Sequence, residues 1–218
     1  MTNYQKELEK ILSAIDPDIR RPRLLLHCCC APCSSYVLEY LSRYFEITAD
    51  FYNPNIAPAA EYHHRAEELQ RLIREMPLSG SVSFEEGPYE PQRYLDAVRG
   101  LENCPEGGER CRVCFHLRLE QAAQRAKAGG FDWFTTTLTI SPLKNAAALN
   151  EIGAALGEEY GVRFLPSDFK KKEGYKRSIT LSREYGLYRQ DFCGCAFSRA
   201  AREAEKQAVA EHQTNAKE

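Results

Sequence analysis

The chain has 218 residues, of which 43% are hydrophobic and 28% are charged, the composition of an ordinary soluble globular protein. This length allows one substantial domain. The formal net charge of −2 argues against a globally basic nucleic-acid binder, although it leaves room for a local basic patch. No apolar run approaches the roughly 20 residues that a membrane-spanning helix needs, which argues against a membrane protein.

The nine cysteines are the most unusual part of the composition. Residues 1–18 are polar and acidic and contain no apolar core of a secretory signal, so we expect a cytoplasmic protein in a reducing environment. Disulfides are rare in that compartment. The cysteines therefore indicate metal or redox chemistry rather than a disulfide framework.

Short apolar stretches alternate with helical patterns over the first 165 residues. This alternation predicts an α/β fold with a parallel sheet. Ser34 and Ser35 are suited to cap the helix that follows the first strand. Strands are expected at residues 24–29, 46–52, 81–85, 131–137 and 162–165, and helices at residues 4–15, 36–44, 59–76, 91–99, 110–128 and 145–160.

The remainder of the chain, residues 166–218, is expected to form a mostly helical C-terminal extension. It consists of a basic loop, a helix at about residues 175–185, a Cys-Gly-Cys segment at residues 193–195 and a charged terminal helix. No internal repeat or low-complexity linker separates this extension from the core at about residues 22–165. We therefore expect residues 1–218 to form a single α/β domain.

The first expected strand ends in Cys28, Cys29 and Cys30, and Cys33 follows three residues later. In an open parallel sheet, ligands bind at the carboxyl ends of the strands. Thiols stand here in the place of the glycines that would allow close approach to a phosphate. The sequence thus predicts a thiol-rich site at this edge of the sheet.

Two further pairs of cysteines lie in separate segments. Cys111 and Cys114 are three residues apart at the start of an expected helix, so both side chains lie on one face and the helix dipole favours their ionised forms. Cys193 and Cys195 flank Gly194, whose lack of a side chain allows the backbone to fold tightly around a ligand. Both pairs have spacings that suit metal ligands.

The three groups together supply seven thiols, more than one simple site requires. A structural zinc ion or a [4Fe–4S] cluster takes four, so a cluster could be accompanied by a second metal with an open coordination position. Alternatively, Cys30 and Cys33 form the C-x-P-C pattern of a thioredoxin-like dithiol, which leaves the other five thiols unexplained. Cys28 and Cys104 have no partner spacing, and Cys28 reads equally well as a small buried hydrophobe.

With these residues the sequence resembles the cobalamin-independent epoxyqueuosine reductases of the QueH type. The resemblance covers about residues 22–200, and the separated cysteine pairs together with the Asp-Phe-Lys-Lys block make it specific. The matching stretches are LLHCCCAPC (25–33), YNPNIAPAAEYHHR (52–65), CRVCFHLRL (111–119), FTTTLTISPLK (134–144), DFKKKEGYKRS (168–178) and YRQDFCGCAFS (188–198).

The resemblance implies a Rossmann-like fold related to the PP-loop (HUP) nucleotide-binding domains. It implies a [4Fe–4S] cluster beside a mononuclear iron, or zinc in its place. The implied reaction is the reduction of epoxyqueuosine to queuosine at the wobble position (34) of tRNA, the last step of queuosine biosynthesis. The implied substrates are the tRNAs with a GUN anticodon, those for Asp, Asn, His and Tyr, and the electrons would come from an external donor protein.

The resemblance also assigns roles to the cysteines of this chain. Members of the family that carry Asp at the position of Cys33 imply that this residue belongs to the mononuclear metal rather than to the cluster. Cys29, Cys33 and Cys195 are the candidates for catalytic thiolates. The full set of implied metal ligands is Cys29, Cys30, Cys33, Cys111, Cys114, Cys193 and Cys195, and the division of the remaining six between the two centres stays open.

A basic strip follows the core and is the candidate for binding tRNA phosphates, although such a run is more often a solvated face. His63 and His64 could supply a proton or a ligand, and a solvated helix surface is an equally good interpretation. The strip consists of Lys170, Lys171, Lys172, Lys176 and Arg177, and the candidates for contacts to the modified base are Tyr52, Thr137, Ser141 and Lys144.

Two alternatives remain at the level of sequence. A PP-loop tRNA thiolase can share the fold, an iron–sulfur cluster and tRNA, but its S-G-G-x-D-S loop for ATP pyrophosphate is replaced here by thiols, which disfavours the use of ATP. A zinc-stabilised tRNA-binding module without catalysis is the alternative from another class. The colour and metal content of the anaerobically purified protein distinguish this module from the reductase, because the module would be colourless and contain only zinc.

Overall fold

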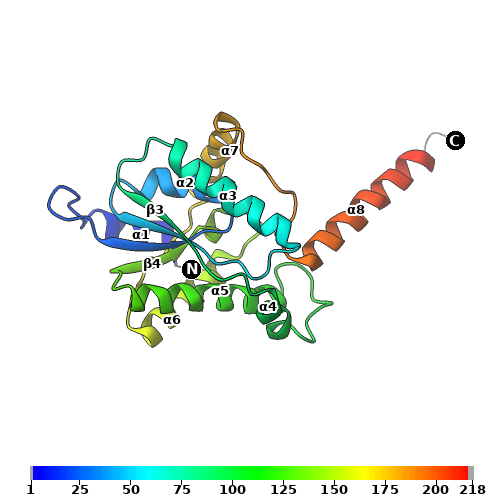
Figure 1. Cartoon of the computed structure of the whole chain (residues 1–218), viewed down its shortest axis with the longest axis horizontal. Coiled ribbons are helices and arrows are strands. Elements are labelled where there is room, and N and C mark those ends of the chain that lie inside the picture. Colours follow the sequence, from blue (N-terminus) through cyan, green and yellow to red (C-terminus); the bar gives the residue numbers. More distant parts are fainter. Residues whose placement is uncertain (1, 216–218) are drawn as a thin grey trace.

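The computed structural model describes residues 2–215, and the side chains of residues 2–210. Its centre is a five-stranded sheet with the order β3-β2-β1-β4-β5, and every neighbouring pair of strands is parallel. Helices cover both faces of this sheet (Figure 1). The predicted α/β fold with a parallel, Rossmann-like sheet is confirmed.

The elements alternate along the chain as expected. The strands are β1 (Arg23–His27), β2 (Glu46–Phe51), β3 (Val82–Glu86), β4 (Trp133–Thr136) and β5 (Arg163–Phe164). The helices are α1 (Tyr4–Leu12), α2 (Ala31–Leu41), α3 (Ala59–Glu75), α4 (Pro91–Ala97), α5 (Glu109–Ala128), α6 (Ala146–Tyr160), α7 (Gly174–Glu184) and α8 (Ala196–Asn215), with a 3₁₀ turn η1 (Thr137–Ile140) after β4.

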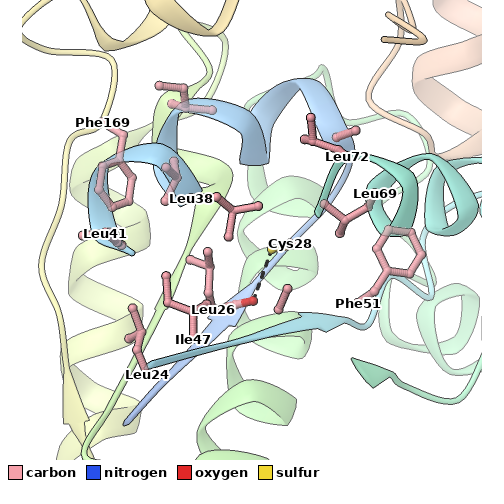
Figure 2. Packing of buried hydrophobic residues seen from close by; sticks show 14 of the residues in the cluster. Leu24, Leu26, Cys28, Leu38, Leu41, Ile47, Phe51, Leu69, Leu72 and Phe169 are labelled. Atoms are coloured by element: carbon pink, nitrogen blue, oxygen red, sulfur yellow. Dashed lines mark hydrogen bonds between the residues drawn. The ribbon is translucent and has the colours of Figure 1, made fainter. Parts of the chain in front are cut away.

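The central strand β1 divides the hydrophobic core into two layers. Leu24 and Leu26 point to the face covered by α1, α2, α3 and α7, whereas Leu25 points to the face covered by α5 and α6. Figure 2 shows the first of these layers, in which Leu26 packs among Leu38 and Leu69. Because β1 is buried on both faces, it reads as a continuous apolar run in the sequence.

The helix after β1 begins earlier than the sequence predicts. The expected start was residue 36, but α2 begins at Ala31 with Cys30 as its N-cap residue. Pro32 favours this start, because its fixed φ and missing N–H suit the first turn of a helix. Ser34 and Ser35 therefore do not cap the helix but lie inside it, where their hydroxyls donate to the carbonyls of Cys30 and Pro32.

The predicted strand at residues 131–137 is also shorter in the structure. β4 ends at Thr136, whose Oγ1 accepts a hydrogen bond from the N–H of Leu138 at 3.1 Å and turns the chain into η1. Hydroxyl side chains compete in this way with a strand ladder. The turn places buried polar residues, among them Thr137, at the carboxyl end of the sheet.

The sheet has its topological switch point between β1 and β4. From β1 the chain proceeds to β2 and β3 on one side, and returns to β4 and β5 on the other. The loops that follow β1 and β4 therefore separate here and leave a crevice, which is where ligands bind in such folds. The cysteines after β1 lie at this point.

The C-terminal part is helical, as expected, and has two different environments. α7 packs on the face of the sheet beside α2, and Leu181 is part of the core there. α8 extends away from the body of the molecule (Figure 1). None of the described helices combines the length and the apolar character of a membrane-spanning segment.

The buried carboxyl of Asp50 on β2 gives the fold a testable pH dependence. Asp50 is fully buried and pairs with Arg125 of α5, which also binds Glu85. Burial raises the pKa of Asp50 to about 6, although Arg125 acts in the opposite direction. The folded state therefore holds the proton to higher pH than the unfolded state, whose Asp has a pKa of about 3.9.

This stabilisation should be present below about pH 4 and be lost as the pH rises through about 6. Two pKa units correspond to roughly 3 kcal/mol. We expect Asp50→Asn to remove this component, so that the free energy of unfolding of the wild type, relative to the variant, falls between pH 4 and pH 7. Urea unfolding at both pH values measures the difference, and parallel pH curves for the two proteins would contradict the assignment.

Candidate metal centre

The loop after β1 brings three thiols together. The Sγ atoms of Cys29, Cys30 and Cys33 all lie within 4.8 Å of one another, and those of Cys29 and Cys30 are 3.8 Å apart. The backbone of Cys30 is extended, with φ −172° and ψ 163°, and α2 starts at the next residue. One helical turn then returns Cys33 to the same side, so the early start of α2 creates the triad.

The triad favours one thiolate, that of Cys29, which accepts hydrogen bonds from the thiols of Cys30 and Cys33. Hydrogen bonds from Cys30 and Cys33 lower the pKa of Cys29 well below its ordinary value, and the charge of Arg118 adds to this effect. The same interactions raise the pKa of Cys30 to about 12 and that of Cys33 well above its ordinary value. A metal ion that binds here must displace the two remaining protons, which couples metal binding to pH.

The other four thiols of the predicted set come from α5 and from the segment before α8. Cys114 and Cys195 are buried in one small apolar cluster with Tyr94. Burial raises the pKa of Cys114 to about 12, and the charges of Cys193 and Cys195 contribute to the shift. Cys111, at the start of α5, accepts a hydrogen bond from the N–H of Gly107 at 3.2 Å.

A cavity of about 420 Å³ connects the two groups of thiols. Cys29 and Cys33 line it from the side of the triad, and Cys193 lines it from the other group. Arg118 also lines it and lies 4.0 Å from the Sγ of Cys114. The segments of Cys29 and Cys193 thus meet at this cavity, while Cys114 lies behind its lining, beside Arg118.

The Cys-Gly-Cys segment needs its glycine and is held by the backbone. Gly194 has φ +117°, a conformation that favours glycine, and a Cβ there would lie 3.0 Å from Ile56 and 3.1 Å from Arg65. The N–H of Ala57 donates to the Gly194 carbonyl at 2.9 Å, and Arg65 Nη1 donates to the Cys193 carbonyl at 3.2 Å. The segment is thus fixed against the loop before α3.

Lys144 joins the loop after η1 to the same segment. Its Nζ donates to the Sγ of Cys193 and to Glu106 Oε1, both at 3.1 Å, and Ser198 Oγ donates to Glu106 Oε2 at 2.9 Å. Burial alone would lower the pKa of Lys144, but the charges of Cys193 and Glu106 raise it above its ordinary value. Lys144 is therefore a cation in the wall of the cavity.

The candidates for contacts to a substrate lie in different places. Ser141 and Lys144 line the cavity. Thr137 is buried with its Oγ1 3.8 Å from the Sγ of Cys29, so it contacts the triad. Tyr52 is outside the lining of the cavity, and its hydroxyl donates to Glu90 at 3.1 Å and accepts from Arg93 at 3.3 Å, both at the start of α4.

Most of the basic strip is paired with acids. The pairs include Lys172 with Glu9 at 2.7 Å and Arg177 with Glu39 at 2.6 Å. Within the part of the chain that the structure describes, Lys171 is the member of the strip without an ion pair. The remaining pairs join Lys170 to Asp168, Lys176 to Glu173 and Arg177 to Glu184.

The histidines fall into two classes. His27 is fully buried, and burial together with the charge of Arg118 lowers its pKa to about 3, so the ring stays neutral. His63 and His64 are exposed on α3, where the ring of His64 contacts Tyr188 at 4.5 Å between centroids. Neither His63 nor His64 lines the cavity.

The two cysteines without a partner spacing stay outside the thiol groups. Cys28 is fully buried in the core, and its Sγ donates to the Leu26 carbonyl at 3.3 Å (Figure 2). Cys104 lies in the loop before α5, where its carbonyl accepts from Arg110. The interpretation of Cys28 as a small buried hydrophobe is consistent with this position.

Sequence reasoning missed the buried cations of the site. Arg65 and Arg118 are 2% and 1% exposed, and both line the cavity. Both lie inside stretches that carry the resemblance, but no local spacing marks an arginine as buried. Glu106 was also missed, because its partners Lys144 and Ser198 are distant in the sequence.

The chain is similar to known proteins over most of its length. The family described as "Epoxyqueuosine reductase QueH" matches residues 24–201. The chain is 46% identical over 198 residues to an epoxyqueuosine reductase QueH of Streptococcus pyogenes serotype M1, covering 90% of this chain and 78% of that protein. It is 37% identical over 181 residues to an epoxyqueuosine reductase QueH of Thermotoga maritima, covering 80% of this chain and 89% of that protein.

Solved structures also share the fold, and one of them contains an iron–sulfur cluster. The U34-tRNA thiolase NcsA from Methanococcus maripaludis, solved with its [4Fe-4S] cluster, superposes with a TM-score of 0.51. The superposition covers 88% of this chain and 67% of that chain at 11% sequence identity. At this identity the likeness establishes the PP-loop type of fold and not the activity.

Arg65 provides a test of how the site is held together. It is buried, pairs with Glu61 at 2.7 Å and holds the Cys193 carbonyl. We expect Arg65→Gln to loosen the Cys-Gly-Cys segment and to lower metal affinity about 10–100-fold, the usual effect of losing a residue that orients a ligand. Metal content per chain and competition with a chelator measure the loss.

The matched control is Arg74→Gln, which changes an exposed arginine on the same helix. This variant should bind metal as the wild type does. Equal metal affinity of the Arg65 and Arg74 variants would show that Arg65 has no part in the site.

Proposed function

This chain belongs to the epoxyqueuosine reductase QueH family and is an oxidoreductase that acts on tRNA. On this premise we propose that its seven thiols are divided between two metal centres. The reaction is the reduction of epoxyqueuosine to queuosine at the wobble position. We assign Cys29, Cys30 and Cys33 to a mononuclear iron. The four other thiols, Cys111, Cys114, Cys193 and Cys195, are then the ligands of a [4Fe–4S] cluster.

The spacing of the sulfur atoms is the observation that supports this division. A tetrahedral metal with metal–sulfur bonds of about 2.3 Å has ligand sulfurs roughly 3.8 Å apart. The Sγ atoms of Cys29 and Cys30 are 3.8 Å apart, and Cys33 lies within 4.8 Å of both. Three protein ligands leave a fourth position open, as in catalytic metal sites. A [4Fe–4S] cluster takes four thiolates, the number that remains.

The reaction removes an epoxide oxygen and leaves an alkene and water, which requires two electrons and two protons. When bound, the cluster would supply electrons one at a time, and the mononuclear metal would offer the epoxide oxygen a Lewis-acidic position. The electrons come from an external donor protein, since the chain carries no nicotinamide or flavin fingerprint.

The walls of the cavity suit a polar ring on a nucleobase. Lys144 and Ser141 lie on one wall and can bind the ring hydroxyls, while Thr137 lies against the triad. Leu138 and Ile140 contribute apolar surface that excludes water from the reacting bond. We therefore retain Ser141 and Lys144 as substrate contacts. Thr137 and Tyr52 both lie outside the lining of the cavity, so we assign Thr137 to the support of Cys29 and exclude both from direct contact in this arrangement.

Phosphate contacts are assigned to the basic strip. Lys172 and Lys176 are 65% and 80% exposed, and exposed ion pairs are worth only about 0–1 kcal/mol. Such pairs can exchange their carboxylate for a tRNA phosphate at little cost. The wobble base lies in a single-stranded loop that can be splayed into the cavity. The tRNAs are those with a GUN anticodon.

The proposed division makes distinct predictions for serine substitutions. Changes at Cys111, Cys114, Cys193 or Cys195 should bleach the broad visible absorbance of the cluster and abolish activity together. Changes in the triad, and Cys33→Ser in particular, should cripple epoxide reduction while most of the absorbance remains. A full set of single Cys→Ser variants, purified without oxygen, is scored for iron, absorbance and conversion of epoxyqueuosine tRNA.

Cys28→Ser and Cys104→Ser serve as controls and should keep cluster and activity. If all seven changes destroy the absorbance alike, or if Cys33→Ser keeps full activity, the division into two centres is wrong. A colourless wild type that contains only zinc would overturn the reductase mechanism itself.

The strip is tested separately through the salt dependence of tRNA binding. The double change Lys171→Ala and Lys172→Ala should weaken binding and reduce the slope of log affinity against log salt by about 1 to 2, as expected for two lost phosphate contacts. Iron content should be unchanged. The control is Lys127→Ala, which changes an exposed lysine near the C-terminal end of α5 and should leave the slope of log affinity against log salt unchanged. An unaltered slope in the double variant would make the strip a solvated face.

A further inference from the structure

Arg118 on α5 is a fully buried cation that lacks a carboxylate partner. It is 1% exposed and lies one helical turn after Cys114. Its Nη2 donates to Asn53 Oδ1 at 2.6 Å, and its Nε donates to His27 Nε2 at 3.3 Å. Both acceptors are neutral, and among the described residues no acid forms an ion pair with it.

A buried charge is costly unless an opposite charge accompanies it. The other two cations in the wall of the cavity with buried side chains have such a partner, since Arg65 pairs with Glu61 and Lys144 pairs with Glu106. For Arg118 the nearby groups that can carry a negative charge are thiols: Cys114 Sγ lies 4.0 Å from Nη1, and Cys29 and Cys193 act on it when they are ionised, as metal ligands are. Its counter-charge is therefore the set of thiolates.

The guanidinium is fixed in this position by the turn after β1. Asn53 Nδ2 donates to the Cys28 carbonyl at 2.9 Å, which orients the amide so that its oxygen faces Arg118. His27 Nδ1 lies 2.9 Å from Thr136 Oγ1, which orients the ring. Arg118 cannot move to solvent without breaking these contacts, so its charge stays beside the sulfurs in every redox state.

We infer that Arg118 is the fixed counter-charge of the metal centre. Its positive charge raises the reduction potential of the metal centre, so that the donor protein can deliver electrons to this centre. A [4Fe–4S] cluster with four thiolates and an iron(II) with three are both net anionic, and each added electron increases that charge. A permanent cation in a buried site stabilises the added electron more than it would in water. Asn53 and His27 act through Arg118 as positioning residues.

This inference rests on the proposed cluster, and reduction potentials test it without a turnover assay. Arg118→Gln removes the charge and keeps a hydrogen-bonding group, while Arg118→Lys keeps the charge. We expect the Gln variant to be reduced at least tenfold less favourably, a potential lower by about 59 mV for a one-electron couple. The Lys variant should recover most of this difference. The measurement is an anaerobic redox titration of the visible absorbance.

Two further variants complete the experiment. Lys127→Gln changes an exposed cation near the C-terminal end of the same helix and should leave the potential unchanged. Asn53→Asp places a carboxylate beside Arg118, neutralises it without removing it, and should lower the potential in the same direction as Arg118→Gln. If Arg118→Gln does not retain iron, the potential of Asn53→Asp tests the role of the Arg118 charge.

The outcomes separate this inference from the proposed function. A wild type without iron–sulfur absorbance would overturn the proposed function, whereas a wild type with the cluster but unchanged potentials in Arg118→Gln and Asn53→Asp would overturn only the role of Arg118. Loss of iron in both Arg118 variants, with an unchanged potential in Asn53→Asp, would also overturn it. Loss of iron in Arg118→Gln alone, with iron retained in Arg118→Lys, would support the counter-charge.

Discussion

The tight connection between β1 and α2 is the constraint on which the site depends. β1 pairs with a parallel neighbour on each side, and the N–H of Cys28 donates to the Asp50 carbonyl at 2.8 Å, so the chain leaves the sheet at a fixed point. Pro32 allows α2 to begin at Ala31. The turn between β1 and α2 therefore consists of Cys28, Cys29 and Cys30. The geometry of the triad follows from the backbone before any metal is bound.

Charge balance is the second requirement that shapes the molecule. Thiols lie close together in a buried crevice at this site. Three cations line the crevice beside them: Arg65 from α3, Arg118 from α5 and Lys144 from the loop after η1. Two of them bring their own carboxylate, which limits their net effect. The third, Arg118, is held only by neutral acceptors, so the helix that carries Cys111 and Cys114 also carries the charge that compensates the thiolates.

Patterns among neighbouring residues predict part of this site, but they do not predict contacts between residues that are far apart in the sequence. The spacing of Cys111 and Cys114 on a helix, and the need for glycine at Gly194, follow from short-range geometry and are present in the structure. The contact of Arg118 with Asn53 spans 65 positions and that of Arg177 with Glu39 spans 138, so no pattern in the sequence predicts either pair. For this reason the sequence identifies the basic strip but not the acids that pair with most of its side chains in the folded chain.

The accessibility of the sulfurs gives the two groups of thiols different roles in the proposed reaction. Cys29 and Cys33 face the cavity, whereas Cys114 and Cys195 are buried behind it among Tyr94 and Leu117. A nucleoside in the cavity therefore meets the triad, and the buried pair is out of its reach. Cys193 lines the cavity and belongs to the second group, so it lies between the two centres. Lys144 holds the Sγ of this residue and Arg65 holds its carbonyl, so the proposed cluster ligand that faces the cavity is also the one fixed by two cations.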